Sequence, residues 1–200
     1  MTSTPSRPPS ADDGAFKAEL VTLIPHLRAF ARTLTGDPTS ADDLAQEAMM
    51  KAWDARASYQ MGTNMKAWTF MILRNQFYSE KRRSWRQTQL DQEAAERTLV
   101  AVDDPEAPVA LDELRQALKT LPEEQREALI LVGAGGFAYE EAAEICQCAV
   151  GTVKSRVSRA RKALAATLER GGYGRDGKAA GDAMRSILAD ADRLSGARQG

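Results

Sequence analysis

The spacing of apolar residues is helical along most of the chain. Between residues 20 and 34 they recur at steps of three and four: Leu20, Leu23, Ile24, Leu27, Phe30, Ala31 and Leu34. This stripe predicts an amphipathic helix that Gly36 ends, in which Pro25 either makes a kink or marks the first turn of the second half. A second helix is predicted to start at the capping-box spacing of Ser40 and Asp43 and to run through Trp53. The chain has no visible strand alternation or internal repeat.

Longer-range patterning divides the chain into parts. A long helix is expected from about Asn64, with aromatic residues along it and a basic end in "EKRRSWR". Residues 87–110 are rich in Gln, Glu, Asp and Ala and are typical of a linker. The chain is therefore predicted to be all-α, with two small helical domains at 16–86 and 111–170. Residues 1–15 are expected to be disordered, and residues 171–200 to be a flexible tail with a short helix.

Composition places the chain among ordinary globular proteins, with 43% hydrophobic and 28% charged residues and a net charge of -1. Its longest nearly apolar run, "ALILVGAGGFAY", is shorter than the roughly 18 residues that a membrane span needs. The polar beginning "MTSTPSRPPSADDG" lacks the apolar stretch of a secretory signal. We therefore expect a cytoplasmic protein that contacts no membrane.

Candidate catalytic and metal chemistry is sparse. Cys146 and Cys148 are separated by one residue, and the single histidine, His26, is distant in sequence, which is too few ligands for a structural zinc site. A structural role for the cysteines is favoured over redox sensing. The chain has no phosphate-binding loop and none of the usual hydrolase or metalloprotease motifs. We expect no enzymatic activity, no metal and no cofactor.

Residues 150–164 predict a basic amphipathic helix. Val150, Val153, Val157, Ala160 and Leu164 fall on one side and indicate a core-facing stripe. The other sides are expected to face DNA and consist of Thr152, Lys154, Ser155, Arg156, Ser158, Arg159, Arg161 and Lys162. A solvated charged surface is the alternative interpretation of such a run.

The residues before this helix favour DNA binding. A short helix "YEEAAEI", a tight turn "CQCA" and the basic helix have the order of a helix-turn-helix motif. Gln147 occupies the turn position where Gly or Asn would adopt a left-handed backbone more easily. In the first domain, basic and aromatic residues alternate along the long helix, as in proteins that hold single-stranded DNA. A plain amphipathic helix explains Trp68 and Tyr78 equally well, but it explains the basic cluster less well.

Four segments carry a family resemblance: "SADDLAQEAMMKAWD", "NMKAWTFMILRNQFYSEKRR", "LPEEQREALIL" and "FAYEEAAEICQCAVGTVKSRVSRARKAL". Together they resemble an extracytoplasmic-function (ECF, group IV) sigma factor of the sigma-70 family, most like the EcfG type of the general stress response. The resemblance implies a two-domain adaptor for RNA polymerase. Residues 16–86 would be region 2, residues 111–170 region 4, and residues 87–110 the linker.

The resemblance also implies partners and site residues. Region 4 would read the minus-thirty-five element and contact the polymerase flap, whereas region 2 would open the minus-ten element. The region 2 residues implied in DNA binding are Asn64, Lys66, Trp68, Arg74, Asn75, Phe77, Tyr78, Lys81, Arg82 and Arg83. Those implied in docking on the clamp coiled coil are Asp42, Asp43, Gln46 and Glu47. An anti-sigma protein of the NepR type would hold the factor inactive, and the free protein would be a monomer.

Two alternatives remain from the sequence. A sigma-like mimic would bind an anti-sigma protein without recognising DNA, but it should have lost groove-facing residues such as Ser155 and Arg159. An ordinary helix-turn-helix regulator would leave the aromatic and basic first domain unexplained.

Overall fold

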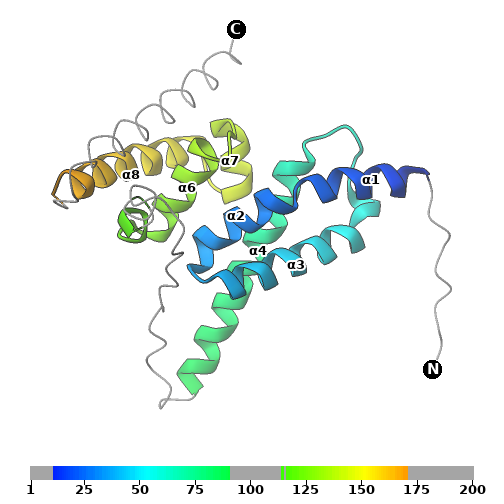
Figure 1. Ribbon diagram of the computed structural model, residues 1–200, viewed down its shortest axis with the longest axis horizontal. Helices are drawn as coiled ribbons and strands as arrows, with labels where there is room; N and C mark the ends of the chain where they lie inside the picture. The colour runs from blue at the N-terminus through cyan, green and yellow to red at the C-terminus, as the bar shows by residue number, and fades with distance from the viewer. Residues whose placement is uncertain (1–10, 91–113, 115, 171–200) are drawn as a thin grey trace, which may run out of the picture.

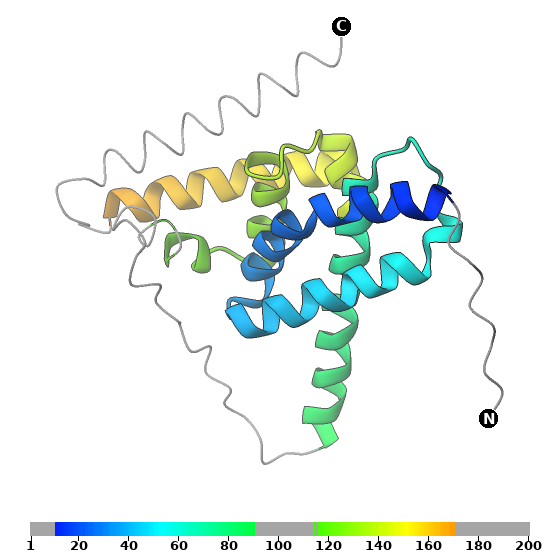
Figure 2. The ribbon, with the colours of Figure 1, turned by 45° about the vertical axis from the view of Figure 1, so that its right-hand side comes forward.

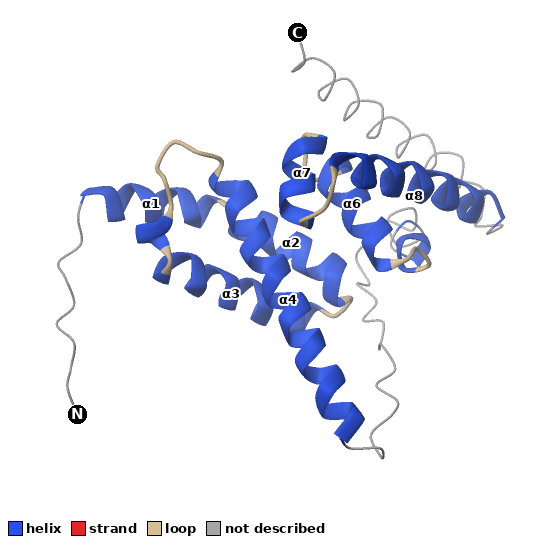
Figure 3. Ribbon diagram, turned by 180° about the vertical axis from the view of Figure 1, so that it is seen from behind, coloured by secondary structure: helices blue, strands red, loops and turns tan. Residues whose placement is uncertain are grey.

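The computed structural model describes residues 11–90, 114 and 116–170, and none of these residues lies in a β-strand (Figures 1 and 3). The labelled elements are α1 (Ala11–Thr22), α2 (Ile24–Thr35), α3 (Pro38–Asp54), the 3-10 turn η1 (Arg56–Ser58), α4 (Met65–Leu90), α6 (Glu123–Gly133), α7 (Tyr139–Cys146) and α8 (Val150–Arg170). Residues 116–119 are also helical. The predicted all-α fold is confirmed.

The helices form two groups that pack against each other. The N-terminal group contains α1 to α4, and the C-terminal group contains α6 to α8. Contacts between the groups run from α4 to α7 and from α2 to α6. In Figure 2, the C-terminal end of α4 projects beyond the other helices. One face of α4 therefore lies against the C-terminal group, while the last turns of α4 project away from it.

The stripe from residue 20 to residue 34 is divided between two helices, which confirms the second of the two interpretations of Pro25. α1 ends at Thr22, Leu23 makes the break, and Pro25 lies in the first turn of α2. Proline fits this position because the amide it lacks would have no partner within the helix. Gly36 ends α2 with a left-handed φ of 74°, as expected. Helix α1 begins at Ala11, so the expectation of disorder is wrong for residues 11–15, and residues 1–10 lie outside the described part.

Helix α3 begins earlier than predicted. Asp37 is the N-cap, and its Oδ2 accepts a hydrogen bond from the Ser40 amide at 2.7 Å. This hydrogen bond lowers the pKa of the Asp37 carboxyl. Pro38 occupies the first helical position, which suits its fixed φ. The predicted capping box of Ser40 and Asp43 is therefore wrong.

Helix α4 is longer than predicted. It continues to Leu90, so residues 87–90 are helical and do not belong to the expected linker. The rest of that linker, and the tail at 171–200 with its expected helix, lie outside the described residues.

Buried apolar residues in both groups confirm the predicted stripes. In the N-terminal group, Leu27, Phe30, Ala31 and Leu34 are all buried. In α8, each residue of the predicted stripe from Val153 to Leu164 is at most 1% exposed. Burying such side chains contributes about 1.5–3 kcal/mol each for the larger aliphatic ones. The stripe thus holds α8 on α6 and α7 and leaves its opposite side to solvent.

The turn between α7 and α8 has the predicted left-handed residue. Gln147 has φ 53° and ψ 46°, and it is the only described non-glycine residue with positive φ. The Cys148 amide donates to the Ala143 carbonyl at 3.1 Å, which closes the end of α7. This turn fixes the direction in which α8 leaves α7.

Two glycines should respond in opposite ways to alanine. A Cβ at Gly135 would lie 2.6 Å from the Leu131 carbonyl oxygen, whereas a Cβ at Gly151 meets nothing within 4 Å. We expect Gly135→Ala to lower the free energy of unfolding by about 1–3 kcal/mol through this clash. Gly151→Ala should raise it by about 0.5 kcal/mol or less, because Gly151 is the second residue of α8 and glycine is a poorer helix former than alanine. Urea unfolding followed by circular dichroism measures both, and equal midpoints for the two variants would contradict this packing.

Candidate DNA and polymerase interfaces

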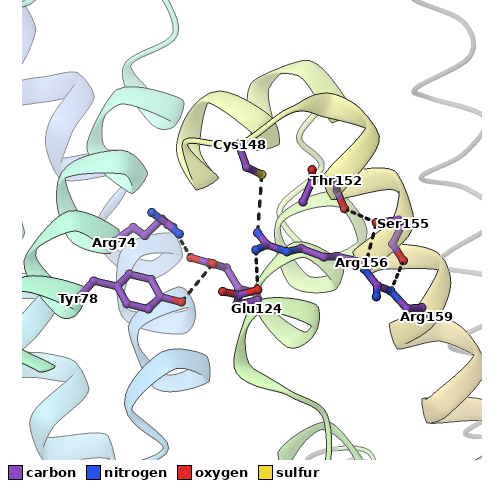
Figure 4. A network of polar contacts seen from close by, with 9 residues as sticks. Arg74, Tyr78, Glu124, Cys148, Thr152, Ser155, Arg156 and Arg159 are labelled. Atoms are coloured by element: carbon purple, nitrogen blue, oxygen red, sulfur yellow. Dashed lines mark hydrogen bonds and ion pairs between the residues drawn. The ribbon is translucent and has the colours of Figure 1, made fainter. Parts of the chain in front are cut away.

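The outer side of α8 carries most of the predicted groove-facing residues. Lys154, Ser155, Ser158, Arg159 and Lys162 are exposed. The side chains are ordered by contacts along the helix, which Figure 4 shows. Arg159 donates from Nη2 to Ser155 Oγ at 3.2 Å, and Ser155 Oγ donates to the Thr152 carbonyl at 2.9 Å. A guanidinium and a hydroxyl held side by side on an exposed helix can donate to base edges in a major groove.

Arg156 does not join this surface. Its side chain is 15% exposed and points toward α6, where it forms an ion pair with Glu124 (Figure 4). Its Nη1 also lies 3.6 Å from Cys148 Sγ. Arg156 therefore links α8 to α6 and to the turn, rather than pointing outward with Arg159. Arg161 and Thr152 are half-buried, so the exposed set is smaller than the eight predicted residues.

One face of α4 contacts the C-terminal group. Lys66, Phe70, Arg74, Tyr78 and Lys81 recur at steps of three and four and form a single face, which we call the α4 stripe. Lys66 Nζ donates to the Gly135 carbonyl at 2.7 Å, and Lys81 pairs with Glu123 of α6. Burial lowers the pKa of Lys66, while Glu141 opposes this effect.

A buried carboxylate lies at the centre of this contact. Glu127 of α6 is fully buried, and its Oε1 accepts from Arg74 Nε at 2.7 Å (Figure 4). Tyr78 OH donates to the other oxygen, Oε2, at 3.3 Å. Burial raises the pKa of Glu127, and Arg74 opposes that effect. Burial and the nearby Glu127 also raise the pKa of Tyr78.

The other predicted residues of α4 are distributed differently. Asn75 is exposed in the middle of α4, and Arg82 and Arg83 are exposed toward its C-terminal end. Phe77 is half-buried, and Trp68 packs in an aromatic cluster 5.0 Å from Tyr59 and 6.1 Å from Phe16. Trp68 therefore packs against the core, which agrees with the plain amphipathic helix that also explained its position in the sequence.

Asn64 caps α4 and contacts the C-terminal group. Its Oδ1 accepts from the Ala67 amide at 3.0 Å, which is the N-cap arrangement. Its Nδ2 donates to Glu141 of α7 at 2.7 Å. Asn64 thus continues the contact of the α4 stripe beyond the start of the helix.

The acidic side of α3 is available to a partner. Asp43, Gln46 and Glu47 are exposed, and the half-buried Asp42 pairs with Arg28 at 3.3 Å. Beside them, Met50 is 66% exposed. Met50 belongs to a shallow groove lined by Lys17, Leu20, Val21, Met49, Met50, Trp53 and Asp54. The four predicted docking residues thus lie on one helix next to exposed apolar surface.

Sequence reasoning missed several residues. Met50 was not among the candidates, whereas Trp85, which is 67% exposed within the basic end of α4, is one of the aromatic residues that the sequence placed among the basic ones. Glu123 and Glu127 were missed because their partners lie 42 and 53 residues away in the chain. One signal was present for Glu127: it shares a helical face with the apolar Leu131, and a charged residue on such a face is usually paired.

The two cysteines and the possible metal ligands form no further candidate site among the described residues. Cys146 is buried, and burial with the nearby Glu127 raises the pKa of its thiol to about 12. Cys148 is half-buried, and both are free thiols. Among the described residues, no cluster of His, Cys, Asp or Glu could hold a metal ion.

The described helices were compared with what a membrane span requires. None of the helices in the described ranges is both long and apolar enough to span a bilayer.

Comparison with known proteins identifies the family. The family described as sigma-70 region 2 matches residues 20–87, and sigma-70, region 4 matches residues 111–164. The ECF RNA polymerase sigma factor EcfG of Rhodopseudomonas palustris is 47% identical over 154 residues, covering 77% of this chain and 85% of that protein. The ECF RNA polymerase sigma-E factor of Escherichia coli K12 is 34% identical over 135 residues, covering 61% of this chain and 70% of that protein.

A solved structure agrees with this assignment. The sigma factor RpoE of Bartonella quintana, in complex with the anti-sigma factor NepR, is 46% identical with a TM-score of 0.70, covering 78% of this chain and 98% of that one. The chain belongs to the extracytoplasmic-function sigma factors of the sigma-70 family and is similar to the EcfG type.

Proposed function

We propose that this protein binds core RNA polymerase and directs promoter-specific initiation of transcription. Residues 16–86 act as region 2 and residues 111–170 as region 4. The observation that carries the proposal is the exposed pair of Ser155 and Arg159 on α8, which hydrogen bonds link to each other and to the half-buried Thr152 within a helix-turn-helix. In this role α8 enters the major groove of the minus-thirty-five element, while Lys154 and Lys162 contact phosphates on either side.

Region 2 supplies strand opening. The exposed Arg82, Arg83 and Trp85 at the end of α4 combine cations with an aromatic face, which suits a melted strand. The α4 stripe and Asn64 extend this surface toward the loop before α4. Because opening a base pair costs a few kcal/mol, such a surface is needed to stabilise the open strand.

The acidic side of α3 is the proposed docking site for the polymerase clamp. Asp43 and Glu47 are one turn apart and exposed, with Met50 beside them as an apolar anchor. An acidic helix face of this kind binds a basic partner helix, and Met is frequent at interface cores. Region 4 would in turn contact the polymerase flap.

Regulation by an anti-sigma protein of the NepR type is supported by the Bartonella quintana relative, which is complexed with NepR. From the sequence resemblance to the EcfG type, we further propose that the protein acts in the general stress response, works in the cytoplasm as a monomer when free, and is a regulator rather than an enzyme. A sigma-like mimic without DNA recognition is the second candidate. The retained groove-facing Ser155 and Arg159 favour the sigma factor.

Replacing Arg159 and replacing Lys154 on α8 should affect DNA binding in different ways. Arg159→Ala should weaken binding by about 1–3 kcal/mol at one base position of the minus-thirty-five element, because a donor to that base is lost. Lys154→Ala should weaken binding to all sequences alike and lower the salt dependence, because it removes a phosphate contact. Affinities for a set of single-base promoter variants at several salt concentrations measure both effects. If the two variants weaken every promoter equally, this division of α8 is wrong.

The proposal is tested by assembling the protein with core polymerase on a promoter. We expect co-elution with the core, and permanganate reactivity of thymines around the minus-ten element that depends on this protein. Failure to bind the core would contradict the proposal and favour the mimic, and a complex that forms but never opens the promoter would contradict the role in initiation.

A further inference from the structure

The loop between η1 and α4, residues 59–64, runs beside α1 (Figure 3). Its residues from Gln60 to Thr63 are all exposed. The Tyr59 hydroxyl donates to the Thr63 carbonyl at 2.7 Å, and the Thr63 hydroxyl donates to the Gln60 carbonyl at 2.7 Å. Gly62 has a φ of 85°, a left-handed backbone that glycine adopts without strain. The loop therefore has a defined turn that Tyr59 closes at its base.

Helix α1 supports the base of this loop through Phe16. The Phe16 ring is 3% exposed and packs edge-on against Tyr59, with centroids 5.6 Å apart. Phe16 also contacts the rings of Trp53 and Trp68, at centroid distances of 6.2 and 6.1 Å. Tyr59 is 8% exposed and its ring centroid lies 5.0 Å from that of Trp68. Phe16 thus joins one ring from each of α3, the loop and α4.

A polar contact joins α1 to the turn before the loop. Arg56 Nε of η1 donates to Asp13 Oδ1 of α1 at 3.0 Å. Arg56 Nη1 also donates to the Trp53 carbonyl at 2.9 Å, and the guanidinium lies 4.6 Å from the centroid of the Trp53 ring. Because Asp13 and Phe16 are three residues apart on a helix, they lie on the same face of α1. One face of α1 therefore holds both η1 and the base of the loop.

The loop leads directly into the strand-binding surface proposed for region 2, which begins at Asn64. An unpaired base is held by hydrogen bonds to its edge and by contact of its faces with aromatic or apolar side chains. Gln60 and Met61 are adjacent and exposed, so the loop offers an amide and an apolar side chain together. Ordering a loop at the moment of binding costs conformational entropy, and a loop that is already ordered avoids this cost. A support that orders the loop in the free protein therefore favours strand opening.

We propose that Asp13 and Phe16 of α1 are positioning residues for promoter opening. They hold residues 59–64 in the conformation in which the loop and Asn64 meet the melted strand. This inference rests on the proposed function, because it assigns strand binding to region 2. The two residues act through Arg56 and Tyr59 and do not touch DNA themselves. Their replacement should slow opening and leave the contacts of α8 with the minus-thirty-five element unchanged.

The first test follows the loop itself in the full-length protein without DNA. Phe16→Leu keeps an apolar side chain and removes the aromatic ring. The Thr63 and Met65 amides donate hydrogen bonds to carbonyls within the loop. We expect them to exchange with deuterium about tenfold faster in this variant than in the parent. Leu34→Ala is the control, because Leu34 is buried at the C-terminal end of α2 and loses the same number of side-chain carbons. Its loop amides should exchange as in the parent.

The second test measures promoter opening by the holoenzyme, from the fluorescence of 2-aminopurine placed in the minus-ten element. We expect Phe16→Leu to slow opening about tenfold. Asp13→Asn should slow it about threefold, because partly exposed ion pairs are weak. Asp13→Glu keeps the carboxylate and should restore opening to nearly the parental rate. Glu19→Gln is the charge control, since Glu19 is exposed on α1 and the change removes the same charge. Affinities for the core and for a minus-thirty-five duplex should be parental throughout.

Several results would overturn this role of α1. Parental loop exchange in Phe16→Leu would show that α1 does not hold the loop. Faster exchange with a parental opening rate would show that the ordered loop does not assist opening. Equal effects of Phe16→Leu and Leu34→Ala would reduce the change to stability, and equal effects of Asp13→Asn and Glu19→Gln would reduce it to net charge. Failure of the parent to open any promoter would instead contradict the proposed function, while loop exchange would still report whether α1 holds the loop.

Discussion

Replacing both Asp43 and Glu47 with arginine will reduce binding of the protein to core RNA polymerase by about 100-fold or more, equivalent to about 2.7 kcal/mol. The two residues are one turn apart on α3 and exposed, so the change reverses the charge of the proposed docking face. Like charges brought together in an interface cost several kcal/mol. Fluorescence anisotropy of the labelled protein titrated with core enzyme measures the loss.

A matched control exists on α7. Glu140 and Glu144 are also exposed and one turn apart, so changing both to arginine alters the net charge by the same amount. This variant should keep most of its affinity for the core. If both double variants lose affinity equally, overall charge and not the α3 face determines docking. Unchanged binding of the α3 variant would remove α3 from the interface.

Leu131→Ala will lower the free energy of unfolding by about 2–5 kcal/mol. Leu131 lies on α6, has no exposed surface, and belongs to the helix that packs on both α7 and α8. Truncation leaves a cavity as well as removing buried apolar surface. Urea unfolding followed by circular dichroism gives the value.

The control for this substitution is Met50→Ala on α3. Met50 is 66% exposed, so the same kind of truncation should change stability by about 0.5 kcal/mol or less. A small effect of Leu131→Ala would contradict the burial of α6. Because α6 supports α8, the destabilised variant should also lose minus-thirty-five binding at temperatures where region 4 unfolds.

Local patterns predicted the parts of this fold that depend on neighbours in sequence. The stripe from Val153 to Leu164 was recognisable because helical spacing alone places those residues on one side, and all are buried. The left-handed residue at Gln147 could be placed because a helix-turn-helix has a fixed turn length. The start of α3 was misplaced although Asp37 and Pro38 were visible signals, since Ser40 and Asp43 offered a competing cap.

Contacts between distant segments could not be predicted in the same way. Arg74 is a cation on an amphipathic helix, and such a residue can equally face solvent, DNA or a carboxylate. Only the packed structure places Glu127, 53 residues further along the chain, at 2.7 Å from it. Arg156 illustrates the same limit, because its position on a basic helix predicts DNA contact while its ion pair with Glu124 directs it toward α6.

The most direct measurement is run-off transcription with purified core RNA polymerase, the full-length protein and a promoter of the stress-response type. We predict transcripts of defined length that require this protein and that disappear when the minus-thirty-five element is replaced. Failure of the folded protein to support any transcript start, on promoters that a related EcfG factor uses, would contradict its assignment as a promoter-recognising sigma factor.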